Sequence, residues 1–260
     1  MAAADDRTRH YDKLRPVEDE AAREARQRAY QLRNLRPLLD PLKPNARVVE
    51  VGPGRGATAK LLREWGVRDY LAIDVCEEYV SDLTAQGFDC RLADDAAVTL
   101  TQSVPDRSCD YILAIDVLEH MELDACRLLL AASKKKLAVG GKLIVQVPNS
   151  SAPFGVNTHL ADPTHLLAFN DVRLVSLLRS AGFDNVRVLP VRLPTSIVNR
   201  LRGLIQKLVF CFVRLLTRAI GATPVGVMTH LMLGTGVAPS MDAKSEPGRP
   251  HDATPRKKVA

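Results

Sequence analysis

The residues with the clearest chemical potential are three alternating glycines, Gly52, Gly54 and Gly56, in the segment RVVEVGPGRGATAK at 47–60. They follow a short apolar run that carries one acid, Glu50, and they precede a segment that favours a helix. Glycine tolerates positive φ and lets a ligand lie directly against the backbone. The start of the following helix offers unpaired N–H groups. The pattern therefore predicts a strand, a tight turn and a helix that together bind a nucleotide-type cofactor.

Acidic residues follow the next two expected strands, 70–75 and 88–92, and they could hold the rest of such a cofactor. Asp74 lies at the tip of the first of these strands, where a carboxylate can accept both hydroxyls of a ribose. Asp94 and Asp95 follow the second strand. One of this pair could bind a polar group of the cofactor, while the other would cap the next turn.

A third group of chemically capable residues follows the fourth expected strand, in the sequence DVLEH. Asp116, Glu119 and His120 are three and four residues apart, so they would share one face if a helix had begun there. Two carboxylates and an imidazole so placed can bind a divalent cation. Further along, His165 lies in a polar loop, where a neutral imidazole could take a proton from a hydroxyl acceptor. His159 is a second candidate for that role.

These polar residues also have structural explanations that the sequence leaves open. His120 could pack against its helix, Glu119 could cap or pair, and His165 could order its loop. Two hypotheses therefore stand beside the structural ones. The first is catalysis by His165 or His120, and the second is a metal site made by Asp116, Glu119, His120 and His165.

The alternation of strand-like and helix-like segments predicts an α/β protein with a doubly wound, mainly parallel sheet. Seven strands are expected, at 48–51, 70–75, 88–92, 111–115, 142–147, 186–191 and within 225–233. Helices are expected at 57–65, at about 117–138 with Gly140 and Gly141 as its end, and at 170–181. A charged, helix-prone segment at 17–39 would form a cap ahead of the sheet.

Residues 196–220 differ from the rest of the chain. Their apolar residues follow helical spacing, while Arg200, Lys207, Arg214 and Arg218 gather on the opposite side of the helical wheel. Such a basic amphipathic helix predicts peripheral contact with an anionic membrane. The alternative is an ordinary helix whose apolar stripe covers the sheet or a second copy of the chain.

Size and composition limit the function classes. The chain has 260 residues, of which 46% are apolar, enough for one large α/β domain with extensions. The formal charge is +6, and the stretch 186–240 contains no Asp or Glu. Five scattered cysteines and the absence of an apolar leader predict a cytoplasmic protein, with the inner face of the membrane as its second location. Only 5% of residues are aromatic, which argues against a nucleic-acid acceptor.

In this order and at these distances the motifs resemble class I S-adenosylmethionine-dependent methyltransferases. The resemblance covers roughly 40–191 and rests on EVGPGRG, AID before Val75, DYILAIDVLEHM, GGKLIVQVPN and LLRSAGF. It implies S-adenosyl-L-methionine as the cofactor, with Glu50 near its ammonium group and Asp95 favoured over Asp94 for its adenine. The implied cofactor-binding residues are Glu50, Gly52, Gly54, Gly56, Asp74, Asp94, Asp95, Ile115 and Asp116.

Finer resemblances concern the metal and the acceptor. DVLEH followed by a later histidine is similar to two metal-using O-methyltransferase groups, those of ubiquinone biosynthesis and those acting on small-RNA 3′ ends. Here the first acid is Asp116 rather than Glu, and many relatives with DVLEH have no known metal. The loop 151–155, the run at 162–165 and the basic helix look like methyltransferases encoded with bacterial polysaccharide genes. That resemblance implies O-methylation of a sugar, a glycan or a small hydroxylated metabolite.

The expected organisation and the competing functions follow from these observations. We expect a disordered start at 1–16, a methyltransferase domain at 17–195, a basic amphipathic helix at 196–221, a candidate last strand within 222–239 and a disordered tail at 240–260. One alternative is a nicotinamide-dependent oxidoreductase that uses Gly52, Gly54 and Ala57, although Pro53 and Gly56 speak against it. The other is a non-catalytic membrane-associated binding module, which the intact glycine turn and Asp74 disfavour.

Overall fold

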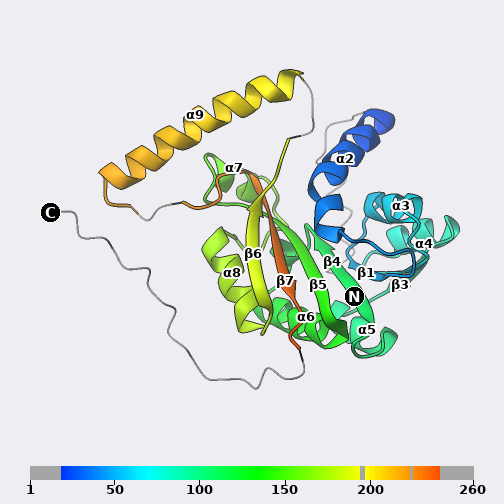
Figure 1. Ribbon diagram of the computed structural model, residues 1–260. Helices are drawn as coiled ribbons and strands as arrows, with labels where there is room; N and C mark the ends of the chain where they lie inside the picture. The colour runs from blue at the N-terminus through cyan, green and yellow to red at the C-terminus, as the bar shows by residue number, and fades with distance from the viewer. Residues whose placement is uncertain (1–18, 194–196, 223–224, 241–260) are drawn as a thin grey trace.

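The computed structural model describes residues 19–193, 197–222 and 225–240, and it contains one seven-stranded sheet (Figure 1). The predicted disorder at 1–16 and beyond 240 lies outside these residues. The strands are β1 (Arg47–Val51), β2 (Asp69–Asp74), β3 (Asp89–Leu92), β4 (Cys109–Ile115), β5 (Leu137–Pro148), β6 (Asp184–Pro190) and β7 (Leu231–Val237). The strand order β3-β2-β1-β4-β5-β7-β6 confirms the predicted doubly wound sheet.

The direction of the strands decides where a ligand can bind. Strands β1 to β5 pair in parallel, while β7 runs antiparallel to both β5 and β6. The strand order reverses between β1 and β4, and in open α/β sheets ligands bind outside the carboxyl ends of the strands at such a point. The residues directly after β1, β2 and β4 are therefore placed at the binding crevice.

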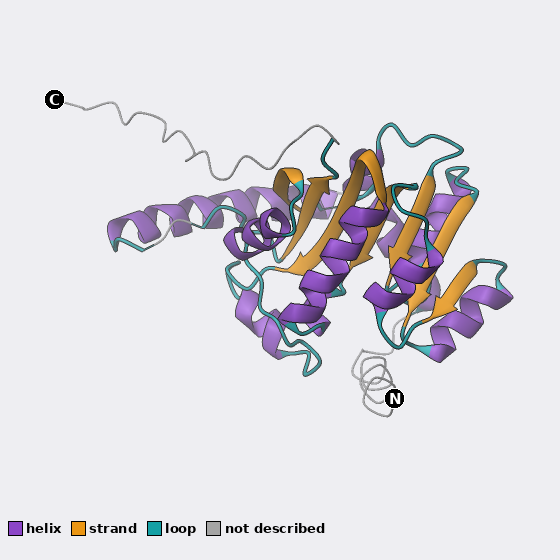
Figure 2. Ribbon diagram, turned by 90° about the horizontal axis from the view of Figure 1, so that it is seen from below, coloured by secondary structure: helices purple, strands orange, loops and turns teal. Residues whose placement is uncertain are grey.

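Helices cover both faces of the sheet (Figure 2). They are α2 (Glu20–Asn34), η1 (Arg36–Leu39), α3 (Ala57–Glu64), α4 (Glu77–Ala85), α5 (Ala96–Ser103), η2 (Leu118–His120), α6 (Leu123–Lys136), α7 (Gly155–Leu160), α8 (Asp171–Ser180) and α9 (Ile197–Ala219). Side chains of β4 alternate between two apolar cores, with Ile112 packing on the α5, α6 and α8 side and Leu113 on the η1 and α3 side. Burial on both faces explains why this strand is an unbroken apolar run.

The two glycines at 140 and 141 do not end a helix, as the sequence suggested. The expected helix at 117–138 is instead the short turn η2 and the separate helix α6, and β5 begins at Leu137. Pairing of β5 with β4 shifts in register between Cys109 and Tyr111. A Cβ on Gly141 would lie 2.8 Å from the Cys109 carbonyl oxygen. Glycine is required there because the two backbones approach closely at the irregularity.

The last strand is also displaced from its predicted position. The apolar run 225–233 predicted it, but β7 spans Leu231–Val237 and includes Gly234 and Gly236. A Cβ on Gly234 would lie 2.8 Å from Val145, and one on Gly236 would lie 2.8 Å from Phe183. Glycine, which usually weakens a strand, is used here so that neighbouring elements can pack directly on the backbone.

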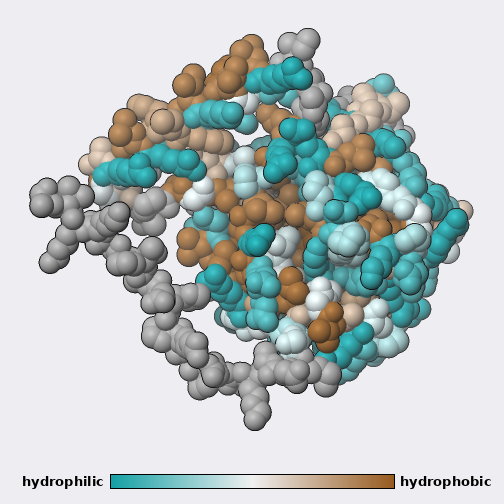
Figure 3. Space-filling model, in the orientation of Figure 1, coloured by the Kyte–Doolittle hydropathy of each residue, from teal (hydrophilic) through white to brown (hydrophobic). Residues whose placement is uncertain are grey.

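Helix α9 confirms the predicted helix at 196–220 and stands apart from the layered body (Figure 1). Apolar side chains are exposed along it, as the brown surface over α9 in Figure 3 shows. Within the described part of the chain, no helix combines the length and the apolar character needed to cross a bilayer.

Candidate functional site

The glycine turn after β1 leaves room beside its middle residue. Gly52, Gly54 and Gly56 all have positive φ, at 71°, 52° and 75°. A Cβ on Gly52 would lie 2.5 Å from Val117, and one on Gly56 would lie 2.2 Å from Leu83. Among the described residues, nothing lies within 4 Å of the corresponding position on Gly54. The outer glycines therefore permit packing, and the central one exposes bare backbone to a ligand.

Asp74 connects this turn to the end of β2. Its carboxylate accepts hydrogen bonds from the Gly54 N–H at 3.2 Å and from the Cys76 N–H at 2.9 Å. Burial raises the pKa of Asp74, and the backbone N–H groups counteract that effect. Each carboxylate oxygen can accept a further hydrogen bond. The Asp74 carboxylate is thus held where it could accept hydrogen bonds from the hydroxyls of a cofactor ribose.

Glu50 is a buried acid beneath the turn. Its side chain is 1% exposed, and the Tyr70 hydroxyl donates a hydrogen bond to it at 2.6 Å. Burial raises the pKa of Glu50 to about 7, although hydrogen bonds from Tyr70 and Thr58 oppose the shift. A carboxylate that is costly to ionise favours a neighbouring cation. Such an environment is compatible with the ammonium group that the resemblance implies near Glu50.

The raised pKa of Glu50 predicts a pH-dependent stability. Its folded-state pKa of about 7 exceeds the ordinary 4.5, so the folded chain retains a proton that the unfolded chain releases. The cofactor-free protein therefore loses stability as pH rises from about 4.5 to about 7, by up to about 3 kcal/mol. We expect Glu50→Gln to raise the free energy of unfolding at pH 8, with little effect at pH 4.5. Urea unfolding at both pH values measures this, with the exposed Glu78→Gln as control. A lower stability of Glu50→Gln than of wild type at pH 8 would contradict it.

Residues Asp94 and Asp95 after β3 divide their roles. The Asp95 carboxylate accepts from the N–H groups of Ala97 at 2.8 Å and Val98 at 3.0 Å, so it caps α5. Asp94 is exposed. The acid that the resemblance favoured for adenine is thus the one used as a cap, and Asp94 becomes the better candidate for the adenine amino group.

Asp116 does not lie on a helix face with Glu119 and His120, contrary to the sequence expectation. After Ile115 ends β4, Asp116 adopts a φ of 55°, which interrupts the backbone before η2. The Gln146 amide donates to both Asp116 carboxylate oxygens at 3.0 Å. The Gln146 side chain of β5 therefore orients the Asp116 carboxylate.

The cap helix α2 contributes a residue that the motifs did not reveal. The Tyr30 hydroxyl donates a hydrogen bond to the Gln146 side-chain oxygen at 2.7 Å, which completes a chain from Tyr30 through Gln146 to Asp116. Burial and the Asp116 charge raise the pKa of Tyr30. On the same helix, the Gln31 amide donates to the Thr58 hydroxyl at 2.9 Å, and Asn34 exchanges two hydrogen bonds with the Arg192 backbone. Only the helical character of 17–39 could have hinted at these contacts.

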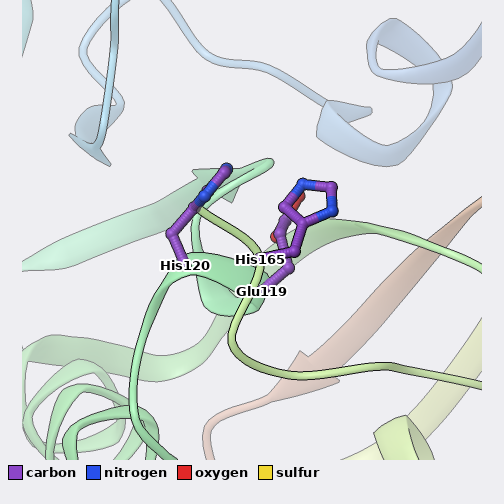
Figure 4. Close-up of side chains that lie close together, drawn as sticks. All are labelled: Glu119, His120 and His165. Carbon is purple, nitrogen blue, oxygen red and sulfur yellow. The ribbon is translucent and has the colours of Figure 1, made fainter. Parts of the chain in front are cut away.

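Glu119, His120 and His165 form a compact group beside the crevice (Figure 4). One ligand atom from each lies within 4.8 Å of the others. Glu119 is 1% exposed, and neither of its carboxylate oxygens has a hydrogen-bond partner among the described residues. Burial, followed by the nearby Asp116 charge, raises the pKa of Glu119 well above its ordinary value. Such a buried carboxyl is stabilised either by a proton or by a cation.

Contacts with neighbouring residues orient both imidazoles of the group. The His120 Nδ1 lies 2.9 Å from the Thr164 hydroxyl, and the His165 Nδ1 lies 3.2 Å from the His159 carbonyl oxygen. Because a carbonyl only accepts, Nδ1 of His165 carries the proton and Nε2 carries the lone pair in the neutral ring. Burial lowers the pKa of His165, despite the opposing charge of Asp162. The ring is thus favoured in its neutral form, and its Nε2 lies 3.9 Å from an Asp162 carboxylate oxygen.

The loop that supplies His165 is held against η2. The N–H groups of Leu166 and Leu167 both donate to the Glu119 carbonyl oxygen, at 2.7 and 3.0 Å. Among the described residues, the structure thus brings together three of the four proposed metal ligands. The fourth, Asp116, does not belong to this group. A carboxylate and two imidazoles fit a divalent metal, because the unpaired buried carboxylate would gain a charge partner.

A groove of about 960 Å³ lies away from this chemistry, between α8 and β6. Its lining includes Asp171, Arg179, Pro190 and Gly226, and none of the proposed site residues. The crevice at the carboxyl ends of β1, β2 and β4 remains the candidate site, because the glycine turn, the ordered acids and the histidine group all meet there.

A glycine turn at the switch point of a parallel sheet, with the buried Asp74 at the end of the next strand, is typical of α/β proteins that bind nucleotide cofactors. Residues 22–188 match the family model described as methyltransferase domain, so this chain belongs to that family. The prediction of an S-adenosylmethionine-dependent methyltransferase, with that cofactor and the Rossmann-like fold, is confirmed. Because the matched family is a methyltransferase family, the alternative of a nicotinamide-dependent oxidoreductase is not supported.

Solved structures share the fold at low sequence identity. A SAM-dependent methyltransferase from Archaeoglobus fulgidus is 20% identical, with a TM-score of 0.59 over 78% of this chain and 90% of that one. A methyltransferase from Mesorhizobium loti is 18% identical, with a TM-score of 0.51 over 77% and 96%. Phosphoethanolamine N-methyltransferase 2 from Haemonchus contortus is 14% identical, with a TM-score of 0.55 over 82% and 56%. No curated protein sequence matches this chain significantly.

Proposed function

We propose that this methyltransferase acts on a hydroxyl oxygen of a sugar, a glycan or another small hydroxylated metabolite. The observation that supports this proposal is the group of Glu119, His120 and His165 at the carboxyl edge, in which the contact of His165 Nδ1 with the His159 carbonyl leaves Nε2 as the proton acceptor. Amine acceptors can arrive unprotonated, whereas a hydroxyl gains most from a neighbouring base. The residue types of the group therefore favour oxygen as the methylated atom.

S-adenosylmethionine supplies an electrophilic methyl group when it is bound. The chain's own contribution is to hold that cofactor, position the acceptor and receive a proton. We assign cofactor binding to Glu50, Asp74, Asp94, the central backbone of the glycine turn and the β4 end at Ile115 and Asp116. The bound cofactor would transfer its methyl group from sulfur to the acceptor oxygen, and Nε2 of His165 would receive the hydroxyl proton. S-adenosylhomocysteine and a methyl ether are the products.

The same side chains support a second role as metal ligands. Glu119, His120 and His165 would hold the ion, and a carboxylate with two imidazoles suits zinc, manganese or iron better than magnesium. Thr164 beside His120 and the His159 carbonyl beside His165 would fix the ring orientations, as outer-shell partners of metal sites do. The metal would supply Lewis-acid activation of the acceptor oxygen.

A methyl-transfer screen tests the proposed function. Purified protein is incubated with S-adenosylmethionine and with sugars, quinols, lipid-linked glycans, phosphoethanolamine and histamine in parallel, and S-adenosylhomocysteine formation is measured. We expect turnover with a hydroxylated acceptor and a product whose mass has increased by one CH₂ group on oxygen. Turnover confined to the amines would contradict the O-methyltransferase assignment. Cofactor binding without any turnover would favour the non-catalytic binding module.

A further inference from the structure

Helix α9 exposes the apolar face that an amphipathic helix normally buries. It contains 23 residues, which corresponds to a length of about 34 Å. Its exposed apolar side chains range from 40% to 72% in exposure. They are Val198, Leu201, Leu204, Ile205, Leu208, Val209, Phe212, Leu215 and Leu216. This apolar face is visible as the brown surface of α9 in Figure 3.

The side of α9 that is partly covered is a different one. Six residues of the helix are only partly exposed, and they recur at intervals of four and three: Asn199, Gly203, Gln206, Phe210, Val213 and Thr217. On a helical wheel their stripe lies about 150° from the centre of the apolar face. The helix therefore turns a side of mixed polarity, and not its apolar face, toward the rest of the chain. The orientation is the reverse of what burial of the apolar face against the sheet would require.

Basic side chains border the apolar face on both sides. Arg200, Lys207 and Arg218 lie along one border, and Arg202 lies along the other. The exposed side chains of these four residues can extend their cationic ends past the apolar face, whereas Arg214 donates to the Gly226 carbonyl oxygen. With no Asp or Glu anywhere in 186–240, this segment has no acid of its own to neutralise them.

The charge pattern separates two occupants of this face. A second copy of the chain would bring a second set of the same cations against the first, without acidic partners in the segment. An anionic bilayer would instead accept the apolar side chains between its acyl chains and the cations at its headgroups. We propose that α9 docks in the plane of an anionic lipid surface with its apolar face inward.

The position of α9 in the chain gives this docking a consequence for substrate choice. The helix is inserted between the end of β6 and the start of β7. Since β6 runs in the same direction as β5, both junctions lie at the carboxyl edge of the sheet, the edge that carries the glycine turn and His165. Docking through α9 turns that edge toward the membrane. The acceptor class that fits is a hydroxylated group carried on a lipid, an inference that rests on the proposed function.

Vesicle sedimentation with the full chain tests the docking. Vesicles of phosphatidylcholine alone are compared with vesicles that also contain phosphatidylglycerol, at low and high salt. We expect binding to the anionic vesicles that weakens at high salt. The double substitution Leu208→Glu and Phe212→Glu should lower binding at least tenfold, as should Arg200→Gln with Lys207→Gln and Arg218→Gln. The control is Leu128→Glu on α6, which also replaces an exposed leucine, 60% exposed, and should bind like wild type.

Two outcomes would overturn the docking proposal. One is the absence of wild-type protein from the anionic vesicle pellet. The other is a dimer by sedimentation velocity that Leu208→Glu with Phe212→Glu converts to a monomer, because the apolar face would then belong to a second copy. Vesicle binding requires no methyl acceptor, so a failed acceptor screen would leave this test intact. If the protein binds vesicles but turns over only free, water-soluble acceptors, the inference of a lipid-carried acceptor is wrong, while the docking proposal still holds.

Discussion

Replacing Asp74 by alanine is expected to lower the affinity for S-adenosylhomocysteine at least a hundredfold. The change removes a buried carboxylate that holds the Gly54 and Cys76 N–H groups and is placed to accept ribose hydroxyls. Hydrogen bonds to a charged group contribute roughly 1.5–3 kcal/mol each, so the loss of two ribose contacts accounts for about 3–6 kcal/mol. Isothermal titration calorimetry measures the affinity directly.

The control for this prediction is Asp89→Ala. Asp89 is an exposed acid at the start of β3, at the opposite end of the strand from the crevice. Its replacement should leave the affinity within about twofold of wild type, and circular dichroism would show that both variants remain folded. A dissociation constant of Asp74→Ala within threefold of wild type would refute the assignment of the ribose-binding acid.

Replacing His165 by alanine is expected to reduce turnover at least a hundredfold while cofactor affinity stays near wild type. A positioned base typically contributes 10²- to 10⁴-fold to a rate. His165 belongs to the loop held against Glu119, and no contact of its ring reaches the glycine turn in the described residues. Initial rates of S-adenosylhomocysteine formation and calorimetry separate the two effects. His159→Ala is the matched control, because it retains the backbone carbonyl that orients His165.

Chelation distinguishes a base from a metal ligand in the same experiment. If His165 acts as a base alone, wild-type turnover should survive EDTA. If it holds a metal, EDTA should abolish turnover and added zinc or manganese should restore it, while Glu119→Gln should lose the metal measured by mass spectrometry. Full activity of His165→Ala would exclude both roles.

The parts of the fold that the sequence predicts well are the locally determined ones. The glycine turn follows from three residues that must adopt positive φ, and the helix after Asn170 begins where its side chain caps the Arg173 N–H at 2.8 Å. Both signals lie within a few residues of the structure that they specify. The same is true of Asp74, whose position at the tip of β2 requires only the strand to be recognised.

The parts that the sequence did not reveal depend on distant contacts. Gly140 and Gly141 predicted the end of a helix, and the last strand was expected within 225–233, but Gly140 lies within β5 and Gly234 within β7. Side chains of β5 and α8 occupy the position that a Cβ on Gly234 would fill. Asp116 was grouped with Glu119 by spacing alone, and the Gln146 amide from the adjacent strand decides its direction instead. Sequence separation hides such pairs, since Asp116 and Gln146 are 30 residues apart.

The two hydrogen bonds between Asn34 and the Arg192 backbone have a consequence for any shortened form of the protein. They fasten the segment leading to α9 onto α2, one turn beyond the tyrosine whose hydroxyl contacts Gln146. Removing the residues before β1 would thus delete α2. Gln146 would lose the hydrogen bond from Tyr30, and the segment before α9 would lose both hydrogen bonds to Asn34.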